Sequence, residues 1–310
     1  LYNAAADDFG KTIDLTRIQV PQKRLCAILG AGEKLRAPRE MKPLPASVTR
    51  LASIVANRRS SLDDIVEVIS YDPVLTAKVI RGANSVFSAP RVPITSVDRA
   101  VVRIGTGAVL ALATAASVEK QLNQACPAYG MDEGDLWRHS VAAALSAQVA
   151  QAFCDAPIPA EAFTAALLHD IGKLVLSRFL DAEALEMLRY AREKWNLSDL
   201  AAEKRVLRVH HGQVGGLMAK RWKLPESIVK GIQFSATPAK GDSVLCDTVH
   251  LADAIARAVE FARENDGRIP QIQVQSRSVV QVGLRVGEVE RLCQRVSTRL
   301  DSVLDLYSSG

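Results

Sequence analysis

The sequence has few cysteines, and their arrangement excludes a disulfide framework. They lie far apart, are odd in number and form no CxxC pair: Cys26, Cys126, Cys154, Cys246 and Cys293. Small secreted domains need several paired cysteines to replace a large core, which this chain does not offer. We therefore expect reduced thiols and a cytoplasmic location.

Aromatic residues and long apolar runs are also scarce. Aromatics make up 5% of the 310 residues, whereas 48% are hydrophobic, so we expect an aliphatic, alanine-rich core that favours helices over sheets. The longest apolar run, around 108–116, is too short to cross a bilayer, and no secretory signal opens the chain. We expect no membrane association. Because the sequence begins with Leu1 rather than Met, it does not tell whether further domains precede it.

A strong excess of one charge is missing as well. The net charge is +5, and lysine and arginine are interleaved with aspartate and glutamate as on an ordinary solvated surface. A nucleic-acid-binding protein usually concentrates its positive charge in a stripe. Nucleic acid is therefore not indicated as a partner, and only the mild positive charge supports it.

Breaks and helical patterns divide the chain into three parts. Residues 1–43 are mixed in composition and punctuated by proline and glycine, so we interpret them as an N-terminal extension or linker. Helical periodicity begins at Leu44, and residues 44–122 are predicted to form an N-terminal helical lobe. A polar connection at 123–134 precedes a second helical lobe over 135–310, which ends in an amphipathic helix.

Local signals support helices in both lobes. Ser61 and Asp64 are spaced as a capping box, and Asp72-Pro73 opens a helix with proline in its first turn. In the second lobe we predict helices over 136–153, 160–179, 182–194, 199–209, 212–222, 225–234, 244–263 and 286–306. Alternation typical of a strand is confined to 271–280. We therefore predict an all-α fold in two lobes.

An adjacent histidine and aspartate stand inside one of these apolar patterns. His169 and Asp170 are flanked by Leu167, Leu168 and Ile171. A buried carboxylate is costly unless it is paired or bound to a cation. Two interpretations are open, namely a stray pair on an exposed helix face or a buried pair at a functional site. The apolar neighbours favour burial.

Two further polar residues, His139 and Asp253, lie in apolar helical segments. A lone helical histidine is usually structural, but an aspartate on an apolar helix face needs a partner. Imidazole nitrogens and carboxylate oxygens together suit a divalent ion such as Fe, Mn, Zn or Mg. We therefore predict that His139, His169, Asp170 and Asp253 converge and could bind one divalent metal ion.

The ordered quartet resembles the HD superfamily of metal-dependent phosphohydrolases, in which these residues bind a divalent metal on an all-helical fold. Flanking motifs narrow the resemblance to the HDOD family, the HD-related output domains. These motifs are Leu44-Pro45, Asp72-Pro73-Val74-Leu75, Asn84-Ser85, Pro93-Ile94-Thr95-Ser96, Ala100-Val101, Ile104-Gly105, Val214-Gly215-Gly216-Leu217 and Trp222-Lys223-Leu224-Pro225. The resemblance spans residues 44–258, more loosely to 306, and implies a bacterial signal-transduction module. Family members are often fused to receiver or cyclic-dinucleotide-related domains.

Two residues one helical turn from the quartet need an interpretation. Lys173 follows Asp170 by three residues; the superfamily resemblance implies support of phosphate or of the aspartate, and a plain i,i+3 ion pair is the alternative. If the protein is an enzyme, Asp170 and Lys173 are its candidate catalytic residues. His250 precedes Asp253 by three residues, and we interpret it as lying outside the ligand set, behind the ligands or at the surface.

The sequence also departs from the family pattern. Many HDOD members carry a His-His pair where this chain has Ser235 and Ala236. In related phosphodiesterases, histidines between the His-Asp pair and the final aspartate supply a second metal, and this chain keeps only His210 and His211 there. The Gly-Tyr-Pro signature of the cyclic-dinucleotide phosphodiesterases is absent. We therefore expect one metal ion and not two.

Two functions from different classes follow from these observations. The favoured one is a regulatory module that senses or relays a signal by binding a signalling protein or a small-molecule or nucleotide ligand, with a metal site that is a remnant of the superfamily. The alternative is a metal-dependent phosphohydrolase or phosphodiesterase acting on a nucleotide or phosphoester. Kinship of fold does not decide between them.

Overall fold

The computed structural model describes residues 41–308 except 58, 85–89, 91 and 273. The expected extension at 1–43 therefore lies outside the described residues, apart from residues 41–43. The described part is mostly helical and contains no strand, only two isolated bridges, which confirms the all-α prediction. The division at 123–134 into two lobes stays a prediction.

The first group of helices follows the local signals of the sequence. Ser61 and Asp64 form the expected capping box, and the Asp72 carboxylate accepts hydrogen bonds from the first turn of the next helix. Gly105, with φ of 82°, ends one helix and directly precedes another. The helices are α3 (Ala46–Ala56), α4 (Leu62–Ser70), α5 (Pro73–Ala83), α6 (Val97–Ile104) and α7 (Thr106–Leu122).

The second group begins after a short 3₁₀ turn, η1 (Pro127–Tyr129), within the expected connection. Its helices are α8 (Asp135–Ala150), α9 (Ala162–Leu168), α10 (Ile171–Phe179), α11 (Ala182–Glu193), α12 (Asp199–Val206), α13 (His211–Arg221), α14 (Glu226–Gln233), α15 (Pro238–Gly241), α16 (Val244–Glu264), α17 (Ser276–Val282), a 3₁₀ turn η2 (Val286–Glu288) and α18 (Val289–Ser308).

Two local predictions were wrong. The single helix expected over 160–179 is two helices, because the backbone breaks at His169 and Asp170 between α9 and α10. The possible strand at 271–280 is not formed either, because its described residues pair with no strand and α17 begins at Ser276. Val282 of that helix is fully buried, and Ser278 donates a hydrogen bond to Asp247 of α16, so packing on α16 replaces strand pairing.

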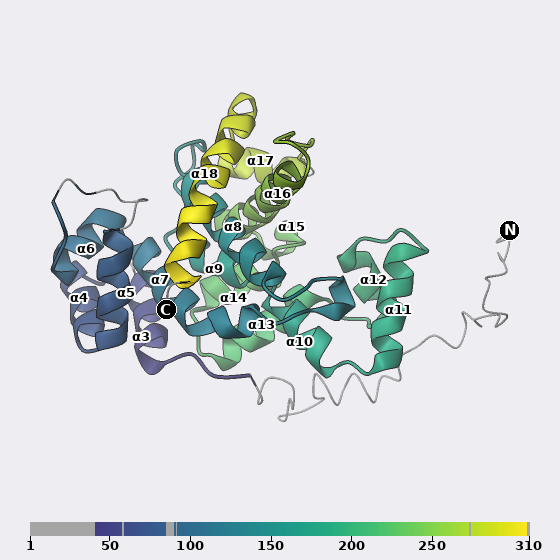
Figure 1. Ribbon diagram of the computed structural model, residues 1–310, viewed down its shortest axis with the longest axis horizontal. Helices are drawn as coiled ribbons and strands as arrows, with labels where there is room; N and C mark the ends of the chain where they lie inside the picture. The colour runs from purple at the N-terminus through teal and green to yellow at the C-terminus, as the bar shows by residue number, and fades with distance from the viewer. Residues whose placement is uncertain (1–40, 58, 85–89, 91, 273, 309–310) are drawn as a thin grey trace, which may run out of the picture.

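Helix α7 joins the two groups. It contacts α3, α5 and α6 of the first group and also α8 and α9 of the second, and in Figure 1 it lies between them. Around the centre, α8 packs against α9, α16 and α18, while α10 packs against α13. Among the described helices none alone is long and apolar enough to cross a membrane; only α6 and α7, bent by 108° relative to each other, meet that test together.

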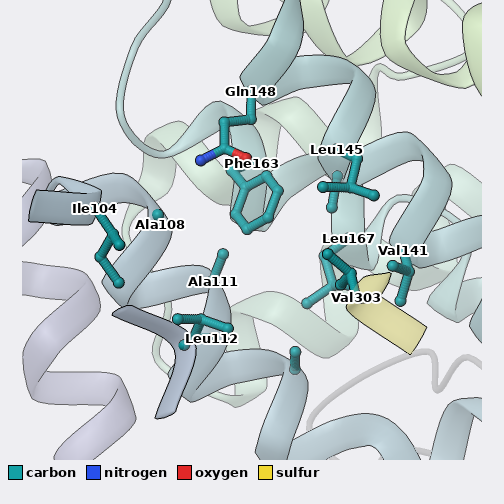
Figure 2. A pocket seen from close by; sticks show the side chains of 13 residues that line it. Ile104, Ala108, Ala111, Leu112, Val141, Leu145, Gln148, Phe163, Leu167 and Val303 are labelled. Carbon is teal, nitrogen blue, oxygen red and sulfur yellow. The ribbon is translucent and has the colours of Figure 1, made fainter. Parts of the chain in front are cut away.

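A small apolar cavity of about 50 Å³ lies where these helices meet. Its lining comes from α5, α6, α7, α8, α9 and α18, and Gln148 is its only polar side chain (Figure 2). Val141 and Leu145 of α8 and Leu167 of α9 are among the lining residues. The cavity therefore contacts helices of both groups at once.

We predict that the two groups of helices do not behave as separable domains. Because α7 is packed against both groups, cutting the connection at 123–134 should leave the two parts associated. Limited proteolysis followed by size-exclusion chromatography measures this directly. Recovery of two fragments that each elute alone and remain folded would contradict the prediction.

Candidate metal centre

The His-Asp pair lies at the junction of two helices. His169 directly follows the last residue of α9, and Asp170 directly precedes the first residue of α10. The side chains are buried, with 1% and 2% of each residue exposed, so the surface interpretation is wrong. The backbone N–H of Lys173 donates to the Asp170 carbonyl at 2.8 Å, which holds the start of α10.

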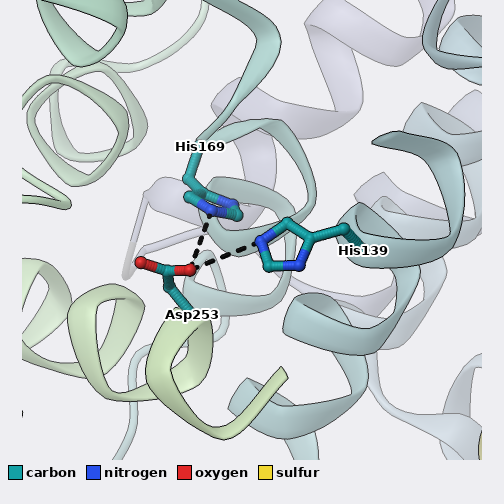
Figure 3. A group of neighbouring side chains, drawn as sticks. All are labelled: His139, His169 and Asp253. Atoms are coloured by element: carbon teal, nitrogen blue, oxygen red, sulfur yellow. Dashed lines mark ion pairs between the residues drawn. The ribbon is translucent and has the colours of Figure 1, made fainter. Parts of the chain in front are cut away.

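The structure brings the other two candidate ligands to this junction. His139 comes from α8 and Asp253 from α16, two helices that pack against each other. Asp253 Oδ1 lies 3.3 Å from His139 Nε2 and 3.6 Å from His169 Nε2, as the dashed lines in Figure 3 show. Ligand atoms of these three side chains all lie within 4.8 Å of one another, close enough to share one ion.

Asp170 completes the cluster and adds one imidazole that the quartet did not include. Its Oδ1 lies 3.5 Å from His169 Nε2 and 3.6 Å from His211 Nε2, and its Oδ2 lies 3.7 Å from His139 Nε2. Three imidazoles and two carboxylates therefore face one small volume. The four expected residues converge; their role as metal ligands stays a prediction.

Each imidazole is oriented from behind through Nδ1. The partners are Glu260 Oε2 for His139 at 2.9 Å, the Ala166 carbonyl for His169 at 2.7 Å, and Glu203 for His211 at 2.8 Å. Because a carbonyl only accepts, His169 Nδ1 carries a proton and donates it to Ala166, which directs Nε2 toward the carboxylates.

His169 Nε2 is buried and has no hydrogen-bond partner among the described residues. Histidine ligands of metals typically show this arrangement, with one nitrogen held by an acceptor and the other free to bind the ion. The donor set of imidazoles and carboxylates suits a divalent ion of the Zn, Fe or Mn type. The residues present therefore fit a metal ion.

Two cations of the chain also contact the carboxylates. Lys173 Nζ lies 2.8 Å from Asp170 Oδ2 and 3.0 Å from Asp199 Oδ2, which is the i,i+3 ion pair expected as one of two alternatives. Arg257 Nη1 lies 2.7 Å from both oxygens of Asp253. Burial opposes ionisation of both aspartates, but the neighbouring histidines and Lys173 lower the pKa of Asp170, and Arg257 and the histidines lower that of Asp253.

The surrounding carboxylates also favour a positive charge at the centre. Burial on its own lowers the pKa of His139, but Glu260, Asp253 and Asp170 outweigh it and raise that pKa to about 10. With no ion bound, His139 therefore carries a proton at neutral pH. A divalent ion would supply the positive charge that this proton otherwise provides.

Sequence reasoning did not assign Glu203, which is fully buried and holds His211 in place. Its carboxylate accepts from the His211 backbone N–H at 2.9 Å and from the hydroxyl of Tyr129. Burial and the nearby Glu203 charge together raise the pKa of Tyr129. The signal available in the sequence was a glutamate on the largely apolar face of a helix eight residues before His211, and without the fold it does not point to this site.

Two other histidines lie outside the ligand set. His250 Nδ1 donates to the Ser235 carbonyl at 2.8 Å, and its Nε2 accepts from the Gln275 backbone N–H at 3.3 Å, so both nitrogens are engaged. It is buried behind the ligands, not at the surface. The pKa of His210 falls to about 4 because of burial and the neighbouring His211.

Comparison with known proteins gives a family and a fold. The family model of the HDOD domain matches residues 41–238. An uncharacterized protein of Treponema pallidum is 22% identical over 196 residues, which are 63% of this chain but only 37% of that protein. The matched region therefore covers well under half of this relative.

Three solved structures share the fold. A candidate signal transduction protein of Marinobacter aquaeolei has a TM-score of 0.68 at 22% identity, covering 94% of this chain and 68% of that one. A candidate phosphohydrolase of Shewanella amazonensis has a TM-score of 0.62 at 26% identity, over 88% and 96%. An HDOD domain protein of unknown function from Geobacter sulfurreducens has a TM-score of 0.58 at 21% identity, over 93% and 97%.

Proposed function

This chain belongs to the HDOD family, and we propose from that premise that it is a bacterial regulatory module built around one divalent metal ion. In this proposal His139, His169, Asp170 and Asp253 hold the ion, with His211 beside them. The module relays a signal to a protein partner or to a small-molecule or nucleotide ligand. The ion fixes the relative positions of the helices that carry its ligands.

One observation carries the metal part of this proposal, namely that three imidazoles present Nε2 to two buried carboxylates while each Nδ1 is held by an acceptor. Orienting three rings in this way costs side-chain entropy, and burying the carboxylates costs solvation. His169 Nε2 is buried and makes no hydrogen bond among the described residues, whereas buried polar atoms usually make one, and a bound ion would satisfy it.

A regulatory role is supported by the way the cluster is connected to the rest of the chain. The helices that carry His139 and His169, α8 and α9, contribute Val141, Leu145 and Leu167 to the cavity at the junction of the two groups. A shift of α7 at that junction would therefore press on the two helices that position the imidazoles. Packed interfaces of this kind transmit small displacements between discrete arrangements.

The residues around the cluster also favour a regulatory role over hydrolysis of a phosphoester. Lys173 and Arg257 engage both carboxylates, and Ser235 and Ala236 offer no imidazole for a second ion. Ser235 is instead buried, with its hydroxyl on the Ile232 carbonyl and its own carbonyl on His250. This donor set therefore supports at most one ion, whereas a binuclear hydrolase needs two.

A metal-dependent phosphohydrolase is the second candidate. It is supported by the likeness to the candidate phosphohydrolase of Shewanella amazonensis and by the complete quartet. A divalent ion at this site would acidify a bound water. Asp170 would orient that water through its carboxylate, and Lys173 would stabilise negative charge beside it.

Two measurements test the proposal together. Elemental analysis of the purified chain, after equilibration with saturating Mn²⁺ or Zn²⁺ and removal of free metal, should find about one divalent ion per chain, and that content should fall in the quartet variants. A panel of nucleotides, cyclic dinucleotides and a generic phosphodiester should show no turnover above the level of an Asp170→Asn variant. Absence of bound metal at saturating Mn²⁺ or Zn²⁺ would refute the metal part, while turnover lost in Asp170→Asn would establish the hydrolase instead.

A further inference from the structure

Arg257 contacts the carboxylate oxygen around which the imidazoles converge. It lies one helical turn after Asp253 on α16, and its Nη1 is 2.7 Å from both Oδ1 and Oδ2 of that residue. Oδ1 is the same atom that lies 3.3 Å from His139 Nε2 and 3.6 Å from His169 Nε2. The positively charged guanidinium of Arg257 therefore already contacts the oxygen to which an ion would bind.

The two cations at the cluster differ in how firmly they are held. The Lys173 side chain is only 8% exposed and is fixed between two carboxylates, Asp170 and Asp199. The Arg257 side chain is 55% exposed, and the hydrogen bonds that it donates within the described part of the chain go to Asp253. Lys173 is therefore the more firmly held of the two cations, whereas the more exposed Arg257 side chain has room to swing toward solvent.

The contacts of Arg257 conflict with those of a bound ion. An ion of the Zn or Fe type needs a ligand oxygen at about 2.0–2.2 Å. The guanidinium nitrogen lies 2.7 Å from that same oxygen and carries a charge of the same sign as the ion. Both oxygens of Asp253 contact this one nitrogen, so an ion bound to either of them lies close to the positive charge of Arg257. Like charges on one carboxylate repel each other, so binding of an ion at Asp253 favours departure of the guanidinium.

We propose that Arg257 is a built-in competitor of the metal ion, which neutralises Asp253 when the site is empty and must leave that carboxylate for a divalent ion to bind. This inference rests on the proposed function, in which the cluster holds a divalent ion. Arg257 thereby sets the concentration at which the module loads. The module responds to a rise in available metal instead of holding an ion permanently.

The opposite role of an arginine at this position makes the opposite prediction. A guanidinium that only orients the carboxylate for the metal would strengthen binding, and its loss would weaken metal affinity about 10–100-fold, as for other groups that support ligands. The competitor and the supporting role therefore predict changes of opposite sign in the same measurement.

The test compares the Mn²⁺ affinity of the full chain with that of three variants. It uses isothermal titration calorimetry on protein from which bound metal has been removed with a chelator. Arg257→Gln removes the charge and keeps a polar side chain, and it should bind Mn²⁺ at least about tenfold more tightly. Arg257→Lys keeps the charge and should retain the affinity of the unaltered chain to within about threefold. Arg263→Gln removes an equal charge from the same helix, where the partner is Asp301, and should leave the affinity unchanged.

The outcomes separate this inference from the proposed function. Equal or weaker binding by Arg257→Gln, with binding by the unaltered chain, overturns the competitor role and leaves the metal site intact. Tighter binding by Arg263→Gln of the same size as by Arg257→Gln also overturns it, since net charge would then explain the effect. If neither the chain nor Arg257→Gln binds Mn²⁺, both the inference and the metal part of the proposed function fail. If Arg257→Gln binds Mn²⁺ and the unaltered chain does not, the competitor role is supported most strongly.

Discussion

Replacing Asp170 with asparagine is expected to lower metal affinity on the order of 100–1,000-fold. Structural sites that bind an ion with about 10–16 kcal/mol distribute that energy over four ligands, about 2.5–4 kcal/mol for each. Asp170 lies within 3.7 Å of three imidazole nitrogens, so its carboxylate is central to the donor set. The measurement is the Mn²⁺ or Zn²⁺ dissociation constant, together with elemental analysis of the purified variant.

Asp170→Asn should also reduce stability, because Lys173 is buried and loses one of its two carboxylates. Breaking a buried ion pair costs up to about 3–5 kcal/mol, and Asp199 retains part of the interaction. The matched control is Asp199→Asn, which removes the other carboxylate from Lys173. In the described part of the chain Asp199 pairs with Lys173 and Arg192 and not with an imidazole, and its side chain is 32% exposed, so this variant should keep its metal affinity to within about tenfold. Equal loss of metal from both variants would contradict the ligand role of Asp170.

Most of the fold could be predicted because its determinants are local. Ser61 and Asp64 cap α4 by direct sequence spacing, and Asp72-Pro73 opens α5, both without help from distant parts of the chain. The break at His169-Asp170 could not be predicted in this way. Leu167, Leu168 and Ile171 continue the apolar pattern across it, whereas in the fold α9 packs on α8 and α10 packs on α13, a difference that the sequence does not show.

The residues of the candidate site could likewise be predicted only in part from the sequence. Residue chemistry was enough to select His139, His169, Asp170 and Asp253, because a carboxylate in an apolar helix needs a partner wherever it lies. The sequence could not show that His211 faces Asp170 from a third direction, since this depends on α13 crossing α10. Arg257 was within reach of prediction, because an arginine four residues after an aspartate shares its helix face. The i,i+4 spacing does not, however, tell whether that pair is exposed or faces a metal site.

The crossing of α10 and α13 depends on the absence of a side chain at Gly172. A Cβ atom at this position would lie 1.9 Å from the His211 carbonyl oxygen and 2.9 Å from the Gly215 nitrogen, both of them backbone atoms. No rotamer change relieves contacts with backbone, so the two helices would have to separate. Because His211 begins α13, its Nε2 would move away from Asp170 as the helices part.

Gly172→Ala is therefore expected to lower the free energy of unfolding by about 1–3 kcal/mol or more, in spite of the better helix propensity of alanine. Chemical denaturation measures the change, and a titration with Mn²⁺ shows whether the metal site is altered at the same time. Gly287→Ala is the matched control, since a Cβ there meets nothing within 4 Å. Gly82→Ala is intermediate, because its Cβ would meet only the tip of the Leu112 side chain, which can rotate. Loss of stability should be largest for Gly172→Ala, smaller for Gly82→Ala and smallest for Gly287→Ala. A Gly172→Ala variant as stable as Gly287→Ala would show that α10 does not pack on α13 this closely.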